Sequence, residues 1–221
     1  MYNFAKRSLD IIVSFIVIFL LLPFLLPICI VLRCTAEGEI FYLQERMGLK
    51  NHKFKIFKFA TMLKDSLNLG TGSITLTGDF RVTSIGKYLR SSKINELPQL
   101  YNILKGDISI VGPRPVLEQD WLLYPDTIRD KIYDVKPGLT GIGSIIFRDE
   151  ESIISSVTDE DPQEFYKRVI APYKGELEMW YQSNNSFFLD LQLIFMTAWV
   201  ILVPTSKLYE KWFKDLPKRS F

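Results

Sequence analysis

The chain has 221 residues and a mass of 25.7 kDa, enough for one domain with a substantial core and short for two. Its composition is 48% hydrophobic and 24% charged, which excludes disordered, collagen-like and coiled-coil chains. One histidine and two cysteines are too few ligands for a zinc site, and a Ser-His-Asp triad is excluded unless His52 serves in it. The net charge of +2 favours no class of partner.

The first predicted element is a membrane segment. Residues 11–32 carry no charge, and a helix of that length is roughly 33 Å long at 1.5 Å per residue, enough to cross a hydrocarbon core. Pro23 and Pro27 each remove a backbone N–H donor from its middle, which predicts a break. The residues leave two topologies open, a re-entrant helix-break-helix and a single-pass helix with a proline kink. The re-entrant one is favoured by basic residues, which mark the cytoplasmic side, at both ends of the run: Lys6, Arg7 and Arg33.

Two strands and a loop are predicted next. Residues 40–59 alternate apolar and polar side chains on either side of a polar turn, a pattern typical of a β-hairpin. The lysines of its second strand predict a solvated or headgroup-facing edge. Residues 66–78 are rich in Gly, Ser and Thr and predict a mobile loop.

A short helix and a buried strand follow. The helix is predicted from about Glu96 to Lys105, with Asn95 as its N-cap and Gly106 at its end. Residues 109–116, SIVGPRPV, predict a buried strand and then a proline-rigid loop that presents Arg114.

The C-terminal third is predicted to be helical. Residues 161–182 predict an amphipathic helical region interrupted at Pro172. The apolar stretch 187–204 contains Asp190, and a lipid-facing aspartate would be costly. We therefore expect this stretch to be an interfacial or docking helix.

Charge is segregated along the chain. Between Arg46 and Lys93 there are ten Lys or Arg and two Asp, whereas residues 149–178 hold nine acids and three bases. A basic block after a membrane segment suits anionic lipid headgroups and a phosphorylated substrate. Nucleic acid fits poorly, because the chain has a membrane run and no recognition motif.

Three blocks of sequence then resemble those of a known family. They are QERMGLKNHKFKIFKFATM at 44–62, DFRVTSIGKYLRSSKINELPQLYNILKGDISIVGPRPV at 79–116, and VKPGLTGIGSI at 135–145. In this order and spacing they resemble the bacterial monotopic phosphoglycosyl transferases, the sugar transferases that initiate polysaccharide and glycoconjugate assembly. The resemblance extends from KRSLD at residues 6–10 to NNSFFLDL at 184–191, most of the chain.

The resemblance implies a fold and a reaction. The fold would be an α/β monotopic membrane protein, with a re-entrant membrane helix at 1–35, a cytosolic catalytic head at 36–183 and an interfacial or docking helix with a tail at 184–221. At the cytosolic face of the bacterial inner membrane, a UDP sugar would donate its sugar phosphate to polyprenyl phosphate with Mg²⁺, giving polyprenyl diphosphate sugar and UMP. Protein partners left open are a second copy of the chain and downstream glycosyltransferases.

The candidate site residues are ones that can bind phosphate groups or a metal ion. Arg114 offers a guanidinium fork that can grip a phosphate through two hydrogen bonds, although a salt bridge to an acid is the plainer interpretation. Lys58, Arg90 and Arg148 are candidates for further phosphate or substrate contacts. Glu96 is the candidate Mg²⁺ ligand.

Two positions depart from the family's pattern. The family uses an Asp-Glu dyad whose Asp takes up the phosphosugar covalently and whose Glu holds the metal, but this chain has Asn95-Glu96. An amide carries no negative charge and cannot form an acyl phosphate directly. Ala60 stands where the family usually has a basic residue. Three explanations compete: an active transferase with another nucleophile or direct attack by the lipid phosphate, a catalytically silent relative that binds nucleotide sugar or acts as a scaffold, and an engineered Asn95. We expect a transferase.

Overall fold

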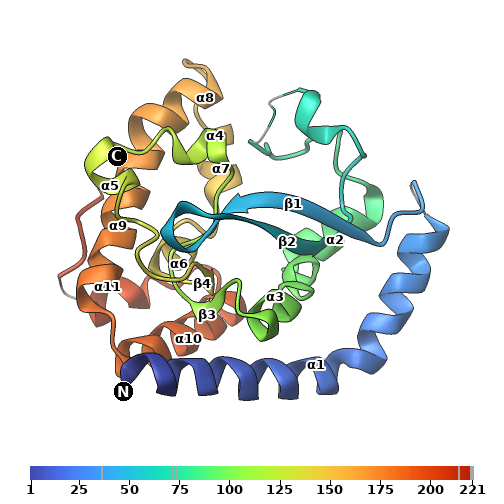
Figure 1. Ribbon diagram of the computed structural model, residues 1–221. Coiled ribbons are helices and arrows are strands. Elements are labelled where there is room, and N and C mark those ends of the chain that lie inside the picture. The colour runs from blue at the N-terminus through green and yellow to red at the C-terminus, as the bar shows by residue number, and fades with distance from the viewer. Residues whose placement is uncertain (36, 71, 73, 214, 220–221) are drawn as a thin grey trace.

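The computed structural model describes residues 1–35, 37–70, 72, 74–213 and 215–219. It begins with α1 (Tyr2–Cys34), which is long and apolar enough to cross a membrane by length and composition. Figure 1 shows α1 running along one side of the molecule and then bending toward the start of the first strand. Pro23 and Pro27 lie inside this helix, so they bend it without ending it. The re-entrant topology stays a prediction.

The first turns of α1 are held to the C-terminal helices by a buried charge. Lys6 Nζ lies 2.7 Å from Asp190 Oδ2, and the side chain of Asp190 is 2% exposed. The hydroxyls of Tyr2 and Tyr181 also donate to this carboxylate, at 2.9 and 2.7 Å. The aspartate of the stretch 187–204 is therefore buried against α1, and the interfacial or docking role of this stretch stays a prediction.

Two further side chains of α1 bind the backbone of the head. Arg7 donates to the carbonyl oxygens of Ile103 and Leu104, at 2.5 and 2.7 Å, and so satisfies the end of a short helix. Asp10 is buried, and its Oδ1 accepts the backbone N–H of Ile110 at 2.9 Å. The N-terminal part of α1 is therefore built into the head.

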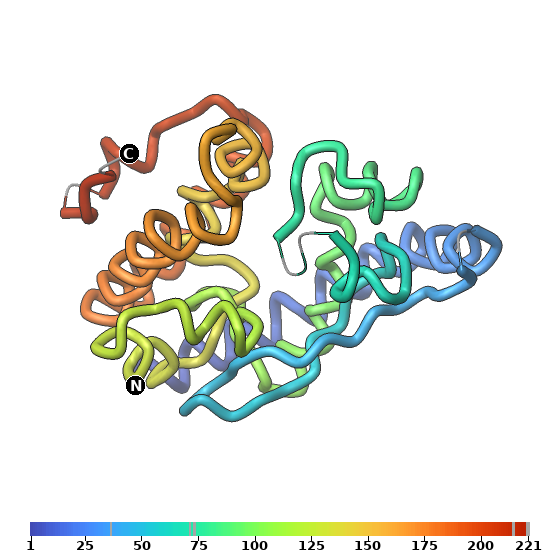
Figure 2. The backbone as a smooth tube through the Cα atoms, turned by 90° about the horizontal axis from the view of Figure 1, so that it is seen from above, coloured from blue at the N-terminus to red at the C-terminus, as the bar shows by residue number. Residues whose placement is uncertain are grey.

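The predicted hairpin is confirmed. β1 (Phe41–Met47) and β2 (Lys53–Phe59) pair antiparallel, with Phe41 opposite Phe59 and Met47 opposite Lys53. The 3₁₀ turn η1 (Leu49–Asn51) joins them. Figure 2 shows the hairpin running from the far end of α1 back toward the head, where the N–H of Lys50 in its turn donates to the carbonyl of Tyr133.

The loop predicted over 66–78 closes around a buried arginine. Its described part contains the 3₁₀ turn η2 (Ser66–Asn68), and positions 71 and 73 lie outside the described residues. Arg81 is 1% exposed and donates to the carbonyls of Ser66 at 2.7 Å and Ile74 at 2.6 Å. Its guanidinium also pairs with Asp79. The buried guanidinium of Arg81 thus donates hydrogen bonds to backbone carbonyl oxygens of the loop and holds the loop in place.

The helix predicted from Glu96 starts later than expected. After α2 (Ser84–Ser91) the chain forms a 3₁₀ turn, η3 (Ile94–Glu96), and α3 spans Gln99–Lys105. The N-cap is Pro98, and Asn95 makes no cap hydrogen bond, so the predicted cap was wrong. Pro98 lacks an N–H and is accepted at a helix start, which places the first turn after it. Gly106 ends α3 at φ 95°, as predicted.

A small parallel sheet and a ring of helices complete the head. β3 (Ser109–Val111) is fully buried, as predicted, and pairs parallel with β4 (Gly138–Thr140). The remaining helices are α4 (Glu118–Trp121), α5 (Asp126–Arg129), α6 (Ile142–Ile146), α7 (Glu150–Ser155), α8 (Pro162–Phe165), the π-helix η4 (Tyr166–Ile170), α9 (Ala171–Asn184), α10 (Phe187–Leu202) and α11 (Leu208–Trp212). The interruption predicted at Pro172 is a change from π- to α-helix, with Pro172 in the first turn of α9. Residues of α3, α6, α9 and α10 share one apolar core with both strands of this sheet.

Candidate active site

The centre of the site is a carboxylate gripped by a guanidinium. Glu96 ends η3 and Arg114 lies between two prolines after β3. Arg114 Nη2 is 2.7 Å from Glu96 Oε1, and Nη1 is 3.4 Å from Oε2. Burial alone would raise the pKa of Glu96, but Arg114 and then Lys58 hold that pKa well below its usual value. The carboxylate is therefore charged at any physiological pH.

The loop that carries Arg114 is fixed by residues that the sequence did not single out. The hydroxyl of Tyr133 donates to the Arg114 carbonyl at 2.8 Å and accepts the N–H of Val116 at 3.1 Å. Glu178 of α9 accepts the backbone N–H of Arg114 at 3.4 Å. Gly143 packs directly against this carboxylate, and a Cβ at position 143 would force the Glu178 carboxylate to shift. Tyr133 and Glu178 lie 19 and 64 residues from Arg114 in sequence, so no local motif pointed to them.

Glu178 is a buried carboxyl group beside this loop. It is 3% exposed, and its Oε2 has no hydrogen-bond partner among the described residues. Burial raises its pKa to about 7, although the Arg114 N–H and the Lys174 ammonium act in the opposite direction. Lys174 itself is paired with Glu150 at 2.8 Å. Glu178 thus exchanges its proton near neutral pH.

Positive charge surrounds the Glu96–Arg114 pair. Lys58 on β2 and Lys93 before η3 both lie within electrostatic range of the pair, and neither makes an ion pair with a described residue. Burial, and then the nearby Arg46, lower the pKa of Lys58. Burial likewise lowers the pKa of Lys93, against the pull of Glu96. Because these cations repel one another, binding of an anionic ligand among them would be favourable. Arg46 and Lys93 lie inside the quoted sequence blocks, which was the available signal for them.

Of the two other predicted arginines, one reaches this cluster. Arg90 of α2 pairs with Glu151 and lies within electrostatic range of Lys58. Arg148 instead donates to the carbonyl of Val200, in the last turn of α10, where helix carbonyls lack partners. The structure therefore places Arg148 on a helix end, away from this cluster. It brings the other five predicted residues together: Lys58, Arg90, Asn95, Glu96 and Arg114.

The oxygen atoms at 95 and 96 suit a magnesium ion. Asn95 is 7% exposed, and its buried Oδ1 has no hydrogen-bond partner among the described residues. Glu96 next to it is a charged carboxylate. Across the described ranges no three His, Cys, Asp or Glu gather into a metal-binding group. Mg²⁺ requires no such cage, because it commonly binds through one or two protein oxygens, waters and substrate phosphates.

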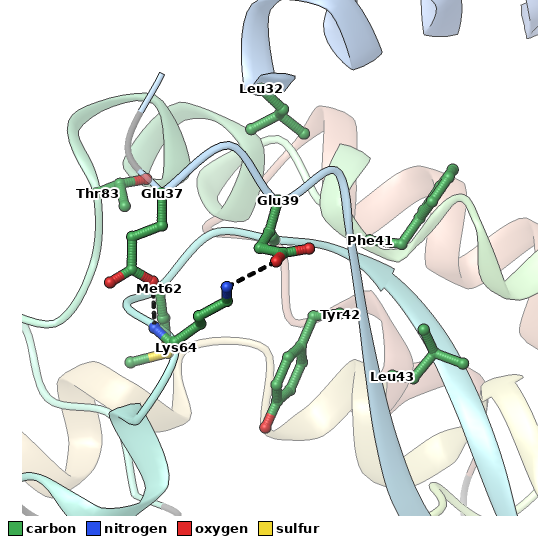
Figure 3. A pocket seen from close by; sticks show the side chains of 10 residues that line it. Leu32, Glu37, Glu39, Phe41, Tyr42, Leu43, Met62, Lys64 and Thr83 are labelled. Atoms are coloured by element: carbon green, nitrogen blue, oxygen red, sulfur yellow. Dashed lines mark hydrogen bonds and ion pairs between the residues drawn. The ribbon is translucent and has the colours of Figure 1, made fainter. Parts of the chain in front are cut away.

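An apolar pocket, shown in Figure 3, meets the cationic cluster at Met62, which lines the pocket and contacts Arg90. It has a volume of about 160 Å³, and neither Glu96 nor Arg114 lines it. Its walls come from the end of α1, the start of β1 and the segment after β2: Leu32, Glu37, Glu39, Phe41, Tyr42, Leu43, Ala60, Met62, Lys64 and Thr83. Ala60 therefore faces an apolar space, next to Met62, whose sulfur lies 3.8 Å from Arg90 Nη1.

The structure thus joins a helix long and apolar enough to cross a membrane to a small head in which cations surround one carboxylate. The chain belongs to the bacterial sugar transferase family, whose model matches residues 1–204. The family predicted from the three sequence blocks is confirmed.

Several of its relatives are named as transferases that act on undecaprenyl phosphate. The chain is 32% identical over 203 residues to a UDP-N-acetylgalactosamine-undecaprenyl-phosphate N-acetylgalactosaminephosphotransferase of Aeromonas hydrophila, a match that covers 91% of this chain and 44% of the relative. It is 34% identical over 200 residues to a UDP-glucose:undecaprenyl-phosphate glucose-1-phosphate transferase of Klebsiella pneumoniae, covering 87% and 39%. It is 36% identical over 173 residues to the uncharacterized sugar transferase EpsL of Bacillus subtilis (strain 168), covering 78% and 75%. The chain thus spans less than half of two of these relatives and three quarters of the third.

Proposed function

We propose that the protein transfers a sugar phosphate from a UDP sugar to polyprenyl (undecaprenyl) phosphate, releasing UMP. The reaction would take place at the cytosolic face of the bacterial inner membrane, as the first membrane step of polysaccharide or glycoconjugate assembly. The observation that carries the proposal is the charged Glu96–Arg114 pair with further cations around it. The head that contains this pair is packed on a helix of membrane-spanning length. The names of two relatives, which specify a UDP sugar and undecaprenyl phosphate, support this donor and acceptor.

The cations have one task in this chemistry. Phosphoryl transfer depends on positioning and on neutralising charge at the phosphate oxygens. Arg114 and Lys58 converge on Glu96, and Lys93 and Arg90 lie in the same field. We assign these four side chains to the two phosphates of the donor and the phosphate of the acceptor.

Glu96 and Asn95 would hold Mg²⁺ through oxygen. When bound, the ion supplies positive charge to the phosphate oxygens. The longer of the two Arg114 contacts, 3.4 Å at Oε2, marks the Glu96 oxygen less engaged by the guanidinium. Chelation with EDTA is expected to abolish turnover, and Mg²⁺ to restore it.

Position 95 decides the path of transfer. Asn95 has no negative charge, and both oxygens of Glu96 already accept from Arg114. We therefore assign the attack to an oxygen of the acceptor phosphate, on the sugar-linked phosphorus of the donor. The bond from that phosphorus to the bridging oxygen breaks, and UMP leaves with the electron pair. The amide at 95 also motivates the second candidate, a catalytically silent relative that binds nucleotide sugar or acts as a scaffold.

UMP release tests the proposal. The protein, purified in detergent, is given undecaprenyl phosphate, Mg²⁺ and a panel of UDP sugars, beside Asn95→Asp and the exposed control Arg168→Gln. We expect UMP release that requires acceptor in the unmodified protein and in the control. Activity only in Asn95→Asp would mean an intact site without its nucleophile. Silence in both would favour the second candidate.

A further inference from the structure

We propose that the pocket at the end of α1 binds the isoprenoid chain of the acceptor, at the unit next to its phosphate. The inference rests on the proposed function and adds the place where the lipid part of the substrate lies. The pocket is the one shown in Figure 3, between α1, β1 and the segment after β2.

The outer side of the pocket continues the apolar surface of α1. Leu32 in its wall belongs to the last turns of that helix. Ile30, just before it, is 64% exposed, and Phe41 and Leu43 in the pocket wall are 44% and 46% exposed. An apolar chain leaving the membrane along α1 would meet apolar side chains until it reached the pocket.

The inner side of the pocket touches the phosphate-binding cluster. Met62 lines the pocket, and its sulfur lies 3.8 Å from Nη1 of Arg90. Tyr42 lines it from β1 and is the register partner of Lys58 on β2. A ligand that fills the pocket and reaches this cluster must have an apolar part joined directly to an anionic part. A polyprenyl phosphate has this structure.

The acidic rim of the pocket sets the direction of the lipid. Lys64 holds both carboxylates of the rim, with its backbone N–H 2.7 Å from Glu37 Oε2 and its Nζ 2.8 Å from Glu39 Oε1 (Figure 3). Two carboxylates and one ammonium would repel a phosphate. The phosphate therefore belongs at the Arg90 side and the chain at the α1 side.

The size of the pocket fits a short piece of isoprenoid. An engineered apolar cavity of about 150 Å³ holds one benzene molecule, so six carbons fill such a space. The pocket, at about 160 Å³, thus takes one five-carbon unit and leaves the rest of the chain outside. Ala60 keeps the space open, because a longer side chain in this wall would occupy it.

Substrate-specific kinetics test the inference. Ala60→Leu fills the pocket, and Leu43→Ser removes apolar surface at an exposed position that tolerates a polar side chain. Loss of most of the contact with one isoprenoid unit is expected to raise the KM for undecaprenyl phosphate about tenfold, with kcat and the KM for the UDP sugar unchanged. Leu122→Ser, an exposed leucine outside the pocket, is the matched control and should behave like the unmodified protein. A rise in the KM for the UDP sugar instead would identify the nucleotide as the occupant and overturn the inference.

Photocrosslinking gives a second readout that needs no turnover. A polyprenyl phosphate with a diazirine on its first isoprenoid unit is irradiated with the full-length protein, and the modified peptides are mapped by mass spectrometry. We expect modification within residues 41–43 and 60–62. Modification elsewhere alone would contradict the inference, even in an active protein. A protein without turnover that is still modified at these residues would retain the lipid site while the proposed reaction fails.

Discussion

The guanidinium of Arg114 contacts both oxygens of Glu96, so its shape matters as well as its charge. Arg114→Lys keeps the charge and loses the fork. Because a charged hydrogen bond contributes about 1.5–3 kcal/mol, we expect kcat/KM to fall by roughly 10- to 150-fold. Arg168→Lys, in the exposed pair with Glu160, is the control and should leave kcat/KM unchanged. Equal activity in Arg114→Lys would mean that a point charge suffices.

Glu178 makes a prediction about stability and pH. Its pKa is raised by burial to about 7, so between its unfolded pKa and 7 the folded protein holds a proton that the unfolded chain releases. The free energy of unfolding therefore falls as pH rises through this window. A pKa shift of this size lowers the free energy of unfolding by about 3 kcal/mol above pH 7. Glu178→Gln removes the ionisable group and therefore this loss of stability. We expect this variant to be stabilised at pH 8 and not at pH 4, measured as thermal midpoints by tryptophan fluorescence in detergent. A gain that did not change with pH would contradict the assignment.

At the scale of single elements, the buried contact between α1 and α10 carries a stability prediction. Lys6→Ala leaves the carboxylate of Asp190 buried without its cation, a loss of about 3–5 kcal/mol. For a chain of this size that corresponds to a fall in the thermal midpoint of roughly 6 °C or more. Lys6→Ala combined with Asp190→Asn should recover part of the loss. Arg168→Ala, in a surface pair, should change the midpoint little; a similarly small fall in Lys6→Ala would contradict the prediction.

Elements with a clear local pattern could be predicted from the sequence, and elements set by distant contacts could not. The alternation of apolar and polar residues predicted the β1–β2 hairpin, and Gly106 predicted the end of α3. The start of α3 was wrong because Asn95 is a good cap in isolation, whereas the chain places it in a 3₁₀ turn beside the site. Glu96 and Arg114 could be named from their motifs, but Tyr133 and Glu178, which fix the Arg114 loop, meet it only in the folded chain.

At the scale of the whole molecule, the topology of α1 is the open prediction. A re-entrant helix places both of its ends on the cytosolic side, whereas a spanning helix places them on opposite sides. Cys34 is exposed at the end of α1 and can be labelled after Cys29→Ser. Asn3→Cys, with Cys29 and Cys34 replaced by serine, reports the other end. In inverted and right-side-out vesicles we expect a membrane-impermeant maleimide to label both positions from the cytosolic side. Labelling from opposite sides would rule out the re-entrant helix.

The division into membrane helix, head and C-terminal segment also stays a prediction at this scale. Lys6 and Arg7 of α1 bind α10 and α3, so the three predicted segments share contacts in the folded chain. The pocket lies at the other end of α1, where Leu32 lines it, and Met62 in its wall contacts Arg90 of the cationic cluster. The arrangement would let a lipid phosphate and a soluble nucleotide meet at one site.

The most direct test of this account is the mass of the lipid product. The unmodified protein is incubated with undecaprenyl phosphate, Mg²⁺ and the UDP sugar that gives most turnover, and the extracted lipid is weighed by mass spectrometry. We predict that the lipid gains one sugar and one phosphate and that UMP appears in equal amount. A lipid that gains the sugar alone, with release of UDP, would contradict the assigned attack on phosphorus. An unchanged lipid with every donor would contradict the proposed reaction itself.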